Sequence, residues 1–137
     1  MSNNTLYLIQ ASYAAAGVQA ELTPFIDDTA SAYAQADLVI CRAGASTVTE
    51  LAAVGAAAIY VPFPHAVDDH QTTNARFVVD AGGGWVVQQT ALSPEKLAHM
   101  IQNMQRSTLL ETAQKAKMMQ KTEATAAVVA ACQELAR

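Results

Sequence analysis

The sequence predicts an α/β fold, with a parallel sheet of about four strands, flanking helices and a helical C-terminal tail. Short apolar runs without alternation, such as "LVIC" at 38–41 and "AAAIYV" at 56–61, are typical of strands buried on both faces. Helical stretches of roughly ten to fifteen residues separate the runs, as in right-handed βαβ crossovers. The chain of 137 residues is therefore expected to form a single domain, 1–137, with a core of its own.

The apolar pattern and the positions of Gly, Pro and capping residues predict where the helices and strands lie. Four strands are expected, at about 20–25, 38–41, 57–61 and 85–88. Helices are expected at 5–16, 27–37, 46–54, the second half of 64–84, 93–104 and 107–137, the last broken near Lys121–Thr122.

Cap residues mark the ends of these helices. Gly17 and Gly55 follow the first and third helices, where a left-handed residue ends a helix most easily. Asp28 is a start signal for the second helix, and Ser93 with Pro94 opens the helix at 93–104.

The overall charge and hydropathy exclude several classes of protein. The net charge of −4 provides no basic surface for nucleic acid or acidic lipid. No run approaches the ~18 apolar residues that span a bilayer, and the first residues do not resemble a signal peptide, so a soluble cytoplasmic domain is expected.

Cysteine and histidine spacing gives no sign of a metal site. Cys41 and Cys132 fit no metal or redox spacing, and both are expected to be small buried apolar residues. His65, His70 and His99 do not lie at zinc-ligand spacings. No metal or cofactor is expected.

The first candidate site is the loop Arg42-Ala43-Gly44-Ala45-Ser46 between "LVIC" and the next helix. Ligands of open parallel sheets bind at the carboxyl ends of strands, where helix N-termini offer free N–H groups to a phosphate. Small residues such as Gly44 and Ala45 let the backbone approach a ligand closely. Ser46 and Thr47 add hydroxyl groups, although Ser46 is equally well explained as the N-cap.

Glu50 lies one turn further on, on the same face as Ser46. A carboxylate there can accept hydrogen bonds from the vicinal hydroxyls of a ribose, or it can be an ordinary exposed helix residue. The residues alone leave both interpretations open.

The second candidate site, "HAVDDHQTTNA", follows the next strand and faces the same edge of the sheet. Asp68, Asp69, His70, Gln71 and Asn74 combine the hydrogen-bond donors and acceptors that sugar hydroxyls require. The alternative is a solvated loop in which Asp69 caps the following helix. Nothing supplies His70 with a nucleophile or an orienting partner, so His70 is assigned to binding.

Taken together and in this order, the two sites resemble the donor-binding half of MurG-like UDP-N-acetylglucosamine transferases, which have the GT-B fold. The similarity runs from Pro24 to Ala75 and continues more weakly through "LSPEKLAHMI". It implies an incomplete Rossmann-like sheet, half of a GT-B fold. It also implies that Ile26 packs or hydrogen-bonds through its backbone at the uracil, and that Ala45, Ser46 and Thr47 line the diphosphate. Glu50 would then hold the ribose, and His70 with Gln71 would contact the GlcNAc hydroxyls. Gly44 and Asn74 are counted with these binding residues. His70 departs from the acidic residue or Gln that is usual in the family.

The resemblance further implies that this chain is part of a C-terminal domain. The N-terminal acceptor domain and the Gly-Gly-Ser turn that opens the donor domain are both absent from the sequence. The family transfers GlcNAc from UDP-GlcNAc to a lipid-linked muramyl-pentapeptide in peptidoglycan synthesis, at the cytoplasmic face of the inner membrane. Its proposed catalytic base lies in the absent domain, so no residue here is assigned as catalytic and the chain alone is expected to be inactive.

Two other functions remain open. The chain could be the donor-binding subunit of a split UDP-GlcNAc transferase, although the missing Gly-Gly-Ser turn argues against it. It could also be a non-catalytic nucleotide-binding module that is indifferent to the sugar. A sheet without its first strand also has an exposed edge through which two copies could associate.

Overall fold

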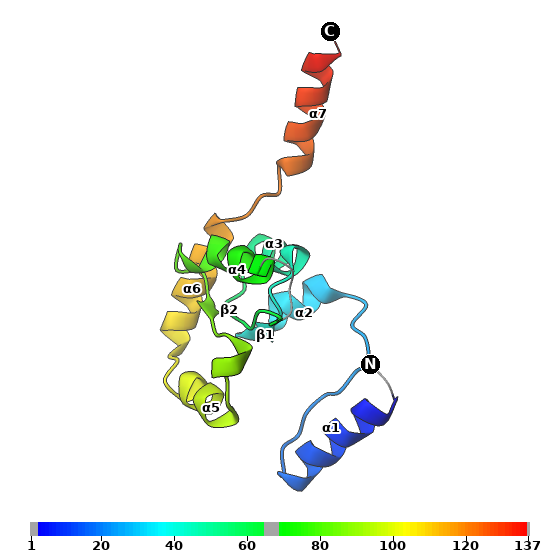
Figure 1. Ribbon diagram of the computed structural model, residues 1–137, viewed down its shortest axis with the longest axis vertical. Helices are drawn as coiled ribbons and strands as arrows, with labels where there is room; N and C mark the ends of the chain where they lie inside the picture. Colours follow the sequence, from blue (N-terminus) through cyan, green and yellow to red (C-terminus); the bar gives the residue numbers. More distant parts are fainter. Residues whose placement is uncertain (1–2, 65–68, 137) are drawn as a thin grey trace. The chain divides into compact units, whose positions relative to one another are not determined.

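The computed structural model describes residues 3–64 and 69–136. These form two compact units, residues 1–32 and 33–137, and each unit is described by itself. Figure 1 shows the order of the helices and strands along the chain.

The first unit contains α1, Asn3–Ala15, and an irregular segment after it. Gly17 has φ +66° and ends the helix as predicted. The strand expected at 20–25 is wrong, because these residues form no strand. Thr23 Oγ1 instead donates a local hydrogen bond of 2.6 Å to the Phe25 carbonyl, and Pro24 between them has no N–H for a ladder.

The helix α2, Thr29–Gln35, begins where the acidic start signal predicted it. The Asp28 carboxylate accepts hydrogen bonds from the Ser31 N–H at 2.9 Å and from its hydroxyl at 2.6 Å. These bonds lower the pKa of Asp28.

The second unit is built on a parallel sheet in the order β1-β2-β3, which confirms the predicted fold class. The strands are β1 (Val39–Cys41), β2 (Ala58–Tyr60) and β3 (Trp85–Val86). Ile59 aligns with Ile40 on one side and with Trp85 on the other. The described residues therefore hold three strands, one fewer than expected, because the segment at 20–25 does not contribute one.

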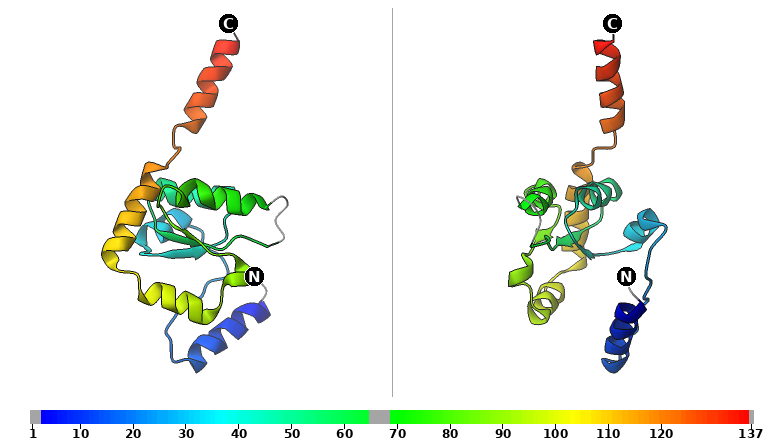
Figure 2. Two further views of the ribbon diagram at one scale, coloured as in Figure 1. Left: turned by 60° about the vertical axis from the view of Figure 1, so that its left-hand side comes forward. Right: turned by 45° about the vertical axis from the view of Figure 1, so that its right-hand side comes forward.

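Helices cover both faces of this sheet, and β2 is buried between them (Figure 2). Ala58 and Tyr60 point to the face covered by α3, Ala45–Val54, α4, His70–Val79, and α6, Arg106–Met118. Ile59 and Val61 point to the other face, where they pack with α5, Pro94–Gln102, and with Leu92, which follows the 3₁₀ turn Gln89–Ala91. Alternate side chains of one strand thus serve two hydrophobic clusters.

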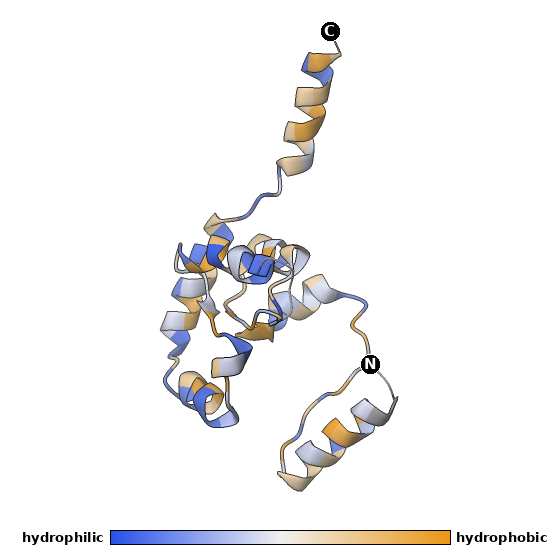
Figure 3. Cartoon of the chain, viewed as in Figure 1, coloured by the Kyte–Doolittle hydropathy of each residue, from blue (hydrophilic) through white to orange (hydrophobic). Residues whose placement is uncertain are grey.

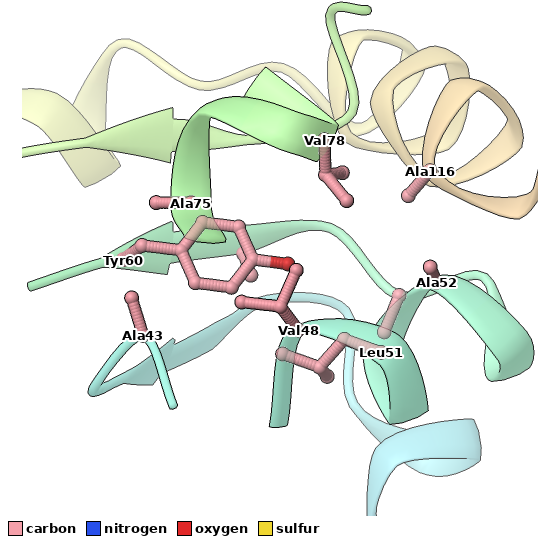
Figure 4. Packing of buried hydrophobic residues seen from close by; sticks show 10 residues of the cluster. Ala43, Val48, Leu51, Ala52, Tyr60, Ala75, Val78 and Ala116 are labelled. Carbon is pink, nitrogen blue, oxygen red and sulfur yellow. The ribbon is translucent and has the colours of Figure 1, made fainter. Parts of the chain in front are cut away.

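The larger cluster surrounds Tyr60, which is fully buried (Figure 4). Val48, Leu51 and Ala52 of α3 pack there, as the sequence predicts. The Tyr60 hydroxyl has no hydrogen-bond partner among the described residues, and burial strongly raises its pKa. Gly55, at φ +80°, ends α3 behind this cluster.

The chain ends in α6 and α7, Ala124–Leu135, and the break between them confirms the predicted break near residue 121. Every described residue of α7 is exposed, including Val128 and Leu135, and Figure 3 shows the hydrophobic residues along it. The expectation that Cys132 is buried is therefore wrong, because no described residue covers the apolar side of this helix. Cys41 is half-buried in β1, and burial raises its pKa to about 11.

Candidate functional site

The loop between β1 and α3 presents an uncapped helix N-terminus at the carboxyl edge of the sheet. Gly44 is the N-cap, with φ −63° and ψ 148°, and no side chain caps the first turn. Because the helix begins at Ala45, the alternative that Ser46 is the N-cap is wrong. The first-turn N–H groups, which point along the helix axis, are left for an external partner.

Neither backbone strain nor crowding requires a glycine at position 44, where it serves as the N-cap. Its backbone conformation is open to any residue, and an added Cβ would meet only Thr47 Oγ1, at 3.8 Å. The space beside the first turn is consequently open. The close approach of a phosphate to this loop stays a prediction, and Thr47 borders the open space.

Glu50 lies in the second turn of α3 and is exposed, on the face that also carries exposed Ser46. Tyr33, at the end of α2, lies near enough to interact with it electrostatically. Burial raises the pKa of Tyr33, and the negative charge of Glu50 adds to that effect. Glu50 thus keeps its carboxylate in solvent, beside the open space at the helix start.

Asp69, at the start of α4, does not cap this helix with its side chain, in contrast to the alternative that the sequence left open. Asp69 has a left-handed backbone with φ 51°, and its side chain makes no cap hydrogen bond to the backbone. Its carboxylate instead accepts a hydrogen bond of 2.6 Å from the Thr72 hydroxyl. His70, the first residue of α4, is exposed, whereas Asp68 lies outside the described residues.

Gln71 and Asn74 bind the backbone of the neighbouring loops. Gln71 Oε1 accepts hydrogen bonds from the Ala43 N–H at 3.3 Å and from the Phe63 N–H at 2.9 Å. Asn74 Nδ2 donates to the Ala43 carbonyl at 3.1 Å. Both amides were predicted as sugar-binding groups, but the structure gives each of them a second task, which is to fix the loop before α3.

Arg42, in the loop after β1, binds the loop after β2. The sequence alone did not predict this role. The Arg42 guanidinium donates to the carbonyls of Val61 and Pro62, both at 3.2 Å, and lies 5.5 Å from the centroid of the Phe63 ring. Only the juxtaposition of the loops after β1 and β2 reveals these contacts. Strand order predicts that the loops are neighbours but not which atoms meet.

Ile26, the residue expected at the uracil, belongs to the first unit. It is 48% exposed, so its side chain is accessible. The other eight predicted residues, Gly44, Ala45, Ser46, Thr47, Glu50, His70, Gln71 and Asn74, are brought together at one edge of the sheet in the second unit.

Within residues 3–64 and 69–136, no three His, Cys, Asp or Glu side chains are grouped so as to hold a metal ion. None of the helices in that described part is long and apolar enough to cross a bilayer. The opposite edge of the sheet carries a hollow of about 490 Å³ beside the ion pair of Asp37 and Arg106. It lies at the amino ends of the strands, away from the predicted residues.

Comparison with known proteins decides the family. Residues 3–130 match the sequence model of the glycosyltransferase family 28 C-terminal domain. The chain belongs to this family.

Relatives and a solved structure agree with this assignment. The chain is 72% identical over 129 residues to the UDP-N-acetylglucosamine–N-acetylmuramyl-(pentapeptide) pyrophosphoryl-undecaprenol N-acetylglucosamine transferase of Polaromonas sp. strain JS666, and 70% identical over 127 residues to that of Paracidovorax citrulli. These matches cover 94% and 93% of this chain but only 33% and 36% of the relatives, so the chain spans about a third of their length. The crystal structure of Acinetobacter baumannii MurG matches with a TM-score of 0.91 and 45% identity, over 97% of this chain and 41% of that one.

Proposed function

We propose that this chain is the part of a UDP-GlcNAc transferase that binds the nucleotide sugar. The observation that carries the proposal is the uncapped start of α3 beside Gly44, followed one turn later by the exposed carboxylate of Glu50. Membership of glycosyltransferase family 28 supports a nucleotide sugar as the ligand of this arrangement.

Each subsite has a physical role in this proposal. The N–H groups of Ala45, Ser46 and Thr47 receive the diphosphate, because a helix N-terminus carries partial positive charge. Glu50 accepts hydrogen bonds from the ribose hydroxyls, and His70 with Gln71 contacts the GlcNAc. Asn74 lies next to this sugar subsite. Ile26 contacts the uracil.

The rest of the reaction is assigned to residues outside this chain. The named relatives are transferases of N-acetylglucosamine and are about three times as long as the match. We infer that the whole protein transfers GlcNAc to a lipid-linked muramyl-pentapeptide, as a step of peptidoglycan synthesis at the cytoplasmic face of the inner membrane. The domain covering 1–137 then binds the nucleotide sugar, and an N-terminal part binds the acceptor and supplies the base.

A titration of this chain with UDP-GlcNAc, followed by amide NMR shifts, tests the proposal. Shifts are expected at residues 43–50 and 70–74, and they should weaken in Glu50→Ala but persist in Glu134→Ala. Glu134 is an exposed carboxylate of α7, so its removal controls for the change in net charge. A folded chain that shows no shifts at millimolar ligand would contradict the proposal.

The same titration with UDP separates the alternatives. A non-catalytic nucleotide-binding module would bind UDP and UDP-GlcNAc equally and would show no shifts at residues 70–74 that depend on the sugar. A split transferase subunit would bind like the proposed domain but would gain activity on addition of a separate acceptor-binding chain. The sheet edge at β1 could pair with a second copy, which a concentration-dependent mass by light scattering would reveal.

A further inference from the structure

Lys121 lies beside the proposed nucleotide site, although it is far from that site in the sequence. It belongs to the segment between α6 and α7, and its ammonium lies 5.9 Å from the centroid of the Phe77 ring on α4. The ammonium therefore lies over the face of an aromatic ring, while the residue as a whole is exposed.

Two adjoining hollows share Lys121 as a lining residue. The first, of about 240 Å³, is lined by Ala45, Val48, Thr49, Asn74, Phe77 and Lys121. The second, of about 380 Å³, is lined by Thr49, Glu50, Ala53, Lys121, Thr122 and Ala124. One hollow therefore touches the proposed diphosphate loop and the other touches the proposed ribose carboxylate.

Lys121 is the single cation among the described residues that line these hollows. Arg42, which lies in the loop itself, already donates to two backbone carbonyls. A nucleoside diphosphate carries negative charge that the first turn of α3 offsets only with partial charges. In the proposed function the phosphates lie at Ala45 and the ribose at Glu50, and Lys121 lines one hollow with each of these residues.

We propose that Lys121, in the segment after α6, binds the diphosphate of the nucleotide. Its ammonium attracts the negative charge of the phosphates. This inference rests on the proposed function, because it takes the start of α3 as the phosphate subsite. It adds an ammonium group to a proposed site that otherwise offers backbone N–H groups, hydroxyls, an imidazole, amides and a carboxylate.

The charge predicts the size of the effect. Opposite unit charges about 8 Å apart attract by an amount equivalent to roughly two- to thirtyfold in affinity, depending on the local dielectric. Because Lys121 is exposed, the lower part of this range applies. Lys121→Met should weaken binding of UDP by about two- to fivefold at low salt and less at high salt.

The test compares four forms of the chain by titration with UDP and with uridine. Lys121→Met keeps an unbranched apolar side chain for the contact with Phe77, and Lys121→Arg keeps the charge. Lys96→Met removes the same charge from α5, on the other face of the sheet. Weaker UDP binding only in Lys121→Met, with uridine binding unchanged in all forms, is the expected result.

The other outcomes overturn one proposal or both. If Lys121→Met and Lys96→Met bind UDP with equal affinity, Lys121 is not a phosphate-binding residue, and the proposed function stands. If Lys121→Met weakens uridine as much as UDP, the side chain acts by packing and not by charge. If the unaltered, folded chain binds neither UDP nor UDP-GlcNAc, the proposed function fails and this inference fails with it.

Discussion

Replacing Gln71 by Met or by Glu should measure how much its two hydrogen bonds to the backbone contribute to the fold. Met has nearly the size and helix propensity of Gln, but it removes the oxygen that accepts from the N–H groups of Ala43 and Phe63. Glu keeps an oxygen at that place. Its negative charge, in the first turn of α4, is also favourable to the helix.

The structure sets the expected loss of stability in Gln71→Met. Ala43 is fully buried, and a buried N–H that loses its partner costs about 1–3 kcal/mol. Phe63 is 44% exposed, so water can replace its lost bond and its contribution is small. We expect a destabilisation of about 2 kcal/mol, equivalent to a fall in Tm of roughly 6 °C for a chain of this size.

The assay is urea unfolding followed by the fluorescence of Trp85, the one tryptophan, which lies in β3 of the same unit. Hydrogen exchange at the Ala43 amide gives a local measurement, which should become faster in Gln71→Met and stay slow in Gln71→Glu. Equal stability of both variants and the unaltered chain would refute the reasoning, because the two hydrogen bonds would then contribute nothing. Equal loss in both variants would also refute it, since packing would be the cause.

Three further predictions concern glycine and cysteine. Gly83→Ala would place a methyl group 2.6–2.8 Å from a side chain of α4 and the backbone of α6, and should lower the free energy of unfolding by about 1–3 kcal/mol in urea. Gly44→Ala meets no such obstacle, so its Tm should change little while the NMR titration shows weaker binding of UDP-GlcNAc. Iodoacetamide at pH 8 should modify exposed Cys132 well before Cys41, whose pKa of about 11 leaves little thiolate, and mass spectrometry of peptides would show the order.

The sheet and its helices could be predicted because their signals are local. β2 is apolar at every position, since both of its faces are covered, and Gly55 ends α3 with a left-handed backbone. The strand expected at 20–25 was wrong because its signal is also local, whereas strand formation depends on a neighbouring strand. Alternation shows which side of a strand would be buried, but a strand also requires a neighbour, and Pro24 with the bond from Thr23 favours a local turn.

Local sequence patterns also do not show which other segments contact α7 or the candidate site. The helical pattern around Cys132 was correct, whereas its burial depended on a covering surface that the described residues do not provide. Gly44 and Glu50 could be proposed together because Gly44 directly precedes the helix that carries Glu50. Arg42 and Lys121 act through contacts with other segments, and no spacing in the sequence encodes those contacts.

The hydrogen bonds of Gln71 and Asn74 to the neighbouring loops are a consequence of the parallel sheet. The ladder ends near Cys41 and Tyr60, so the backbone groups of Ala43 and Phe63 just beyond it need partners from elsewhere. Side chains at the start of α4 provide those partners, because parallel strands put the loops and the helix N-termini at one edge. Gln71 and Asn74, which we propose lie at the sugar subsite, therefore also hold the loop that is proposed to receive the phosphate. A loss of binding on removing Gln71 or Asn74 cannot by itself be assigned to a lost ligand contact, and only variants that keep the backbone hydrogen bonds measure that contact.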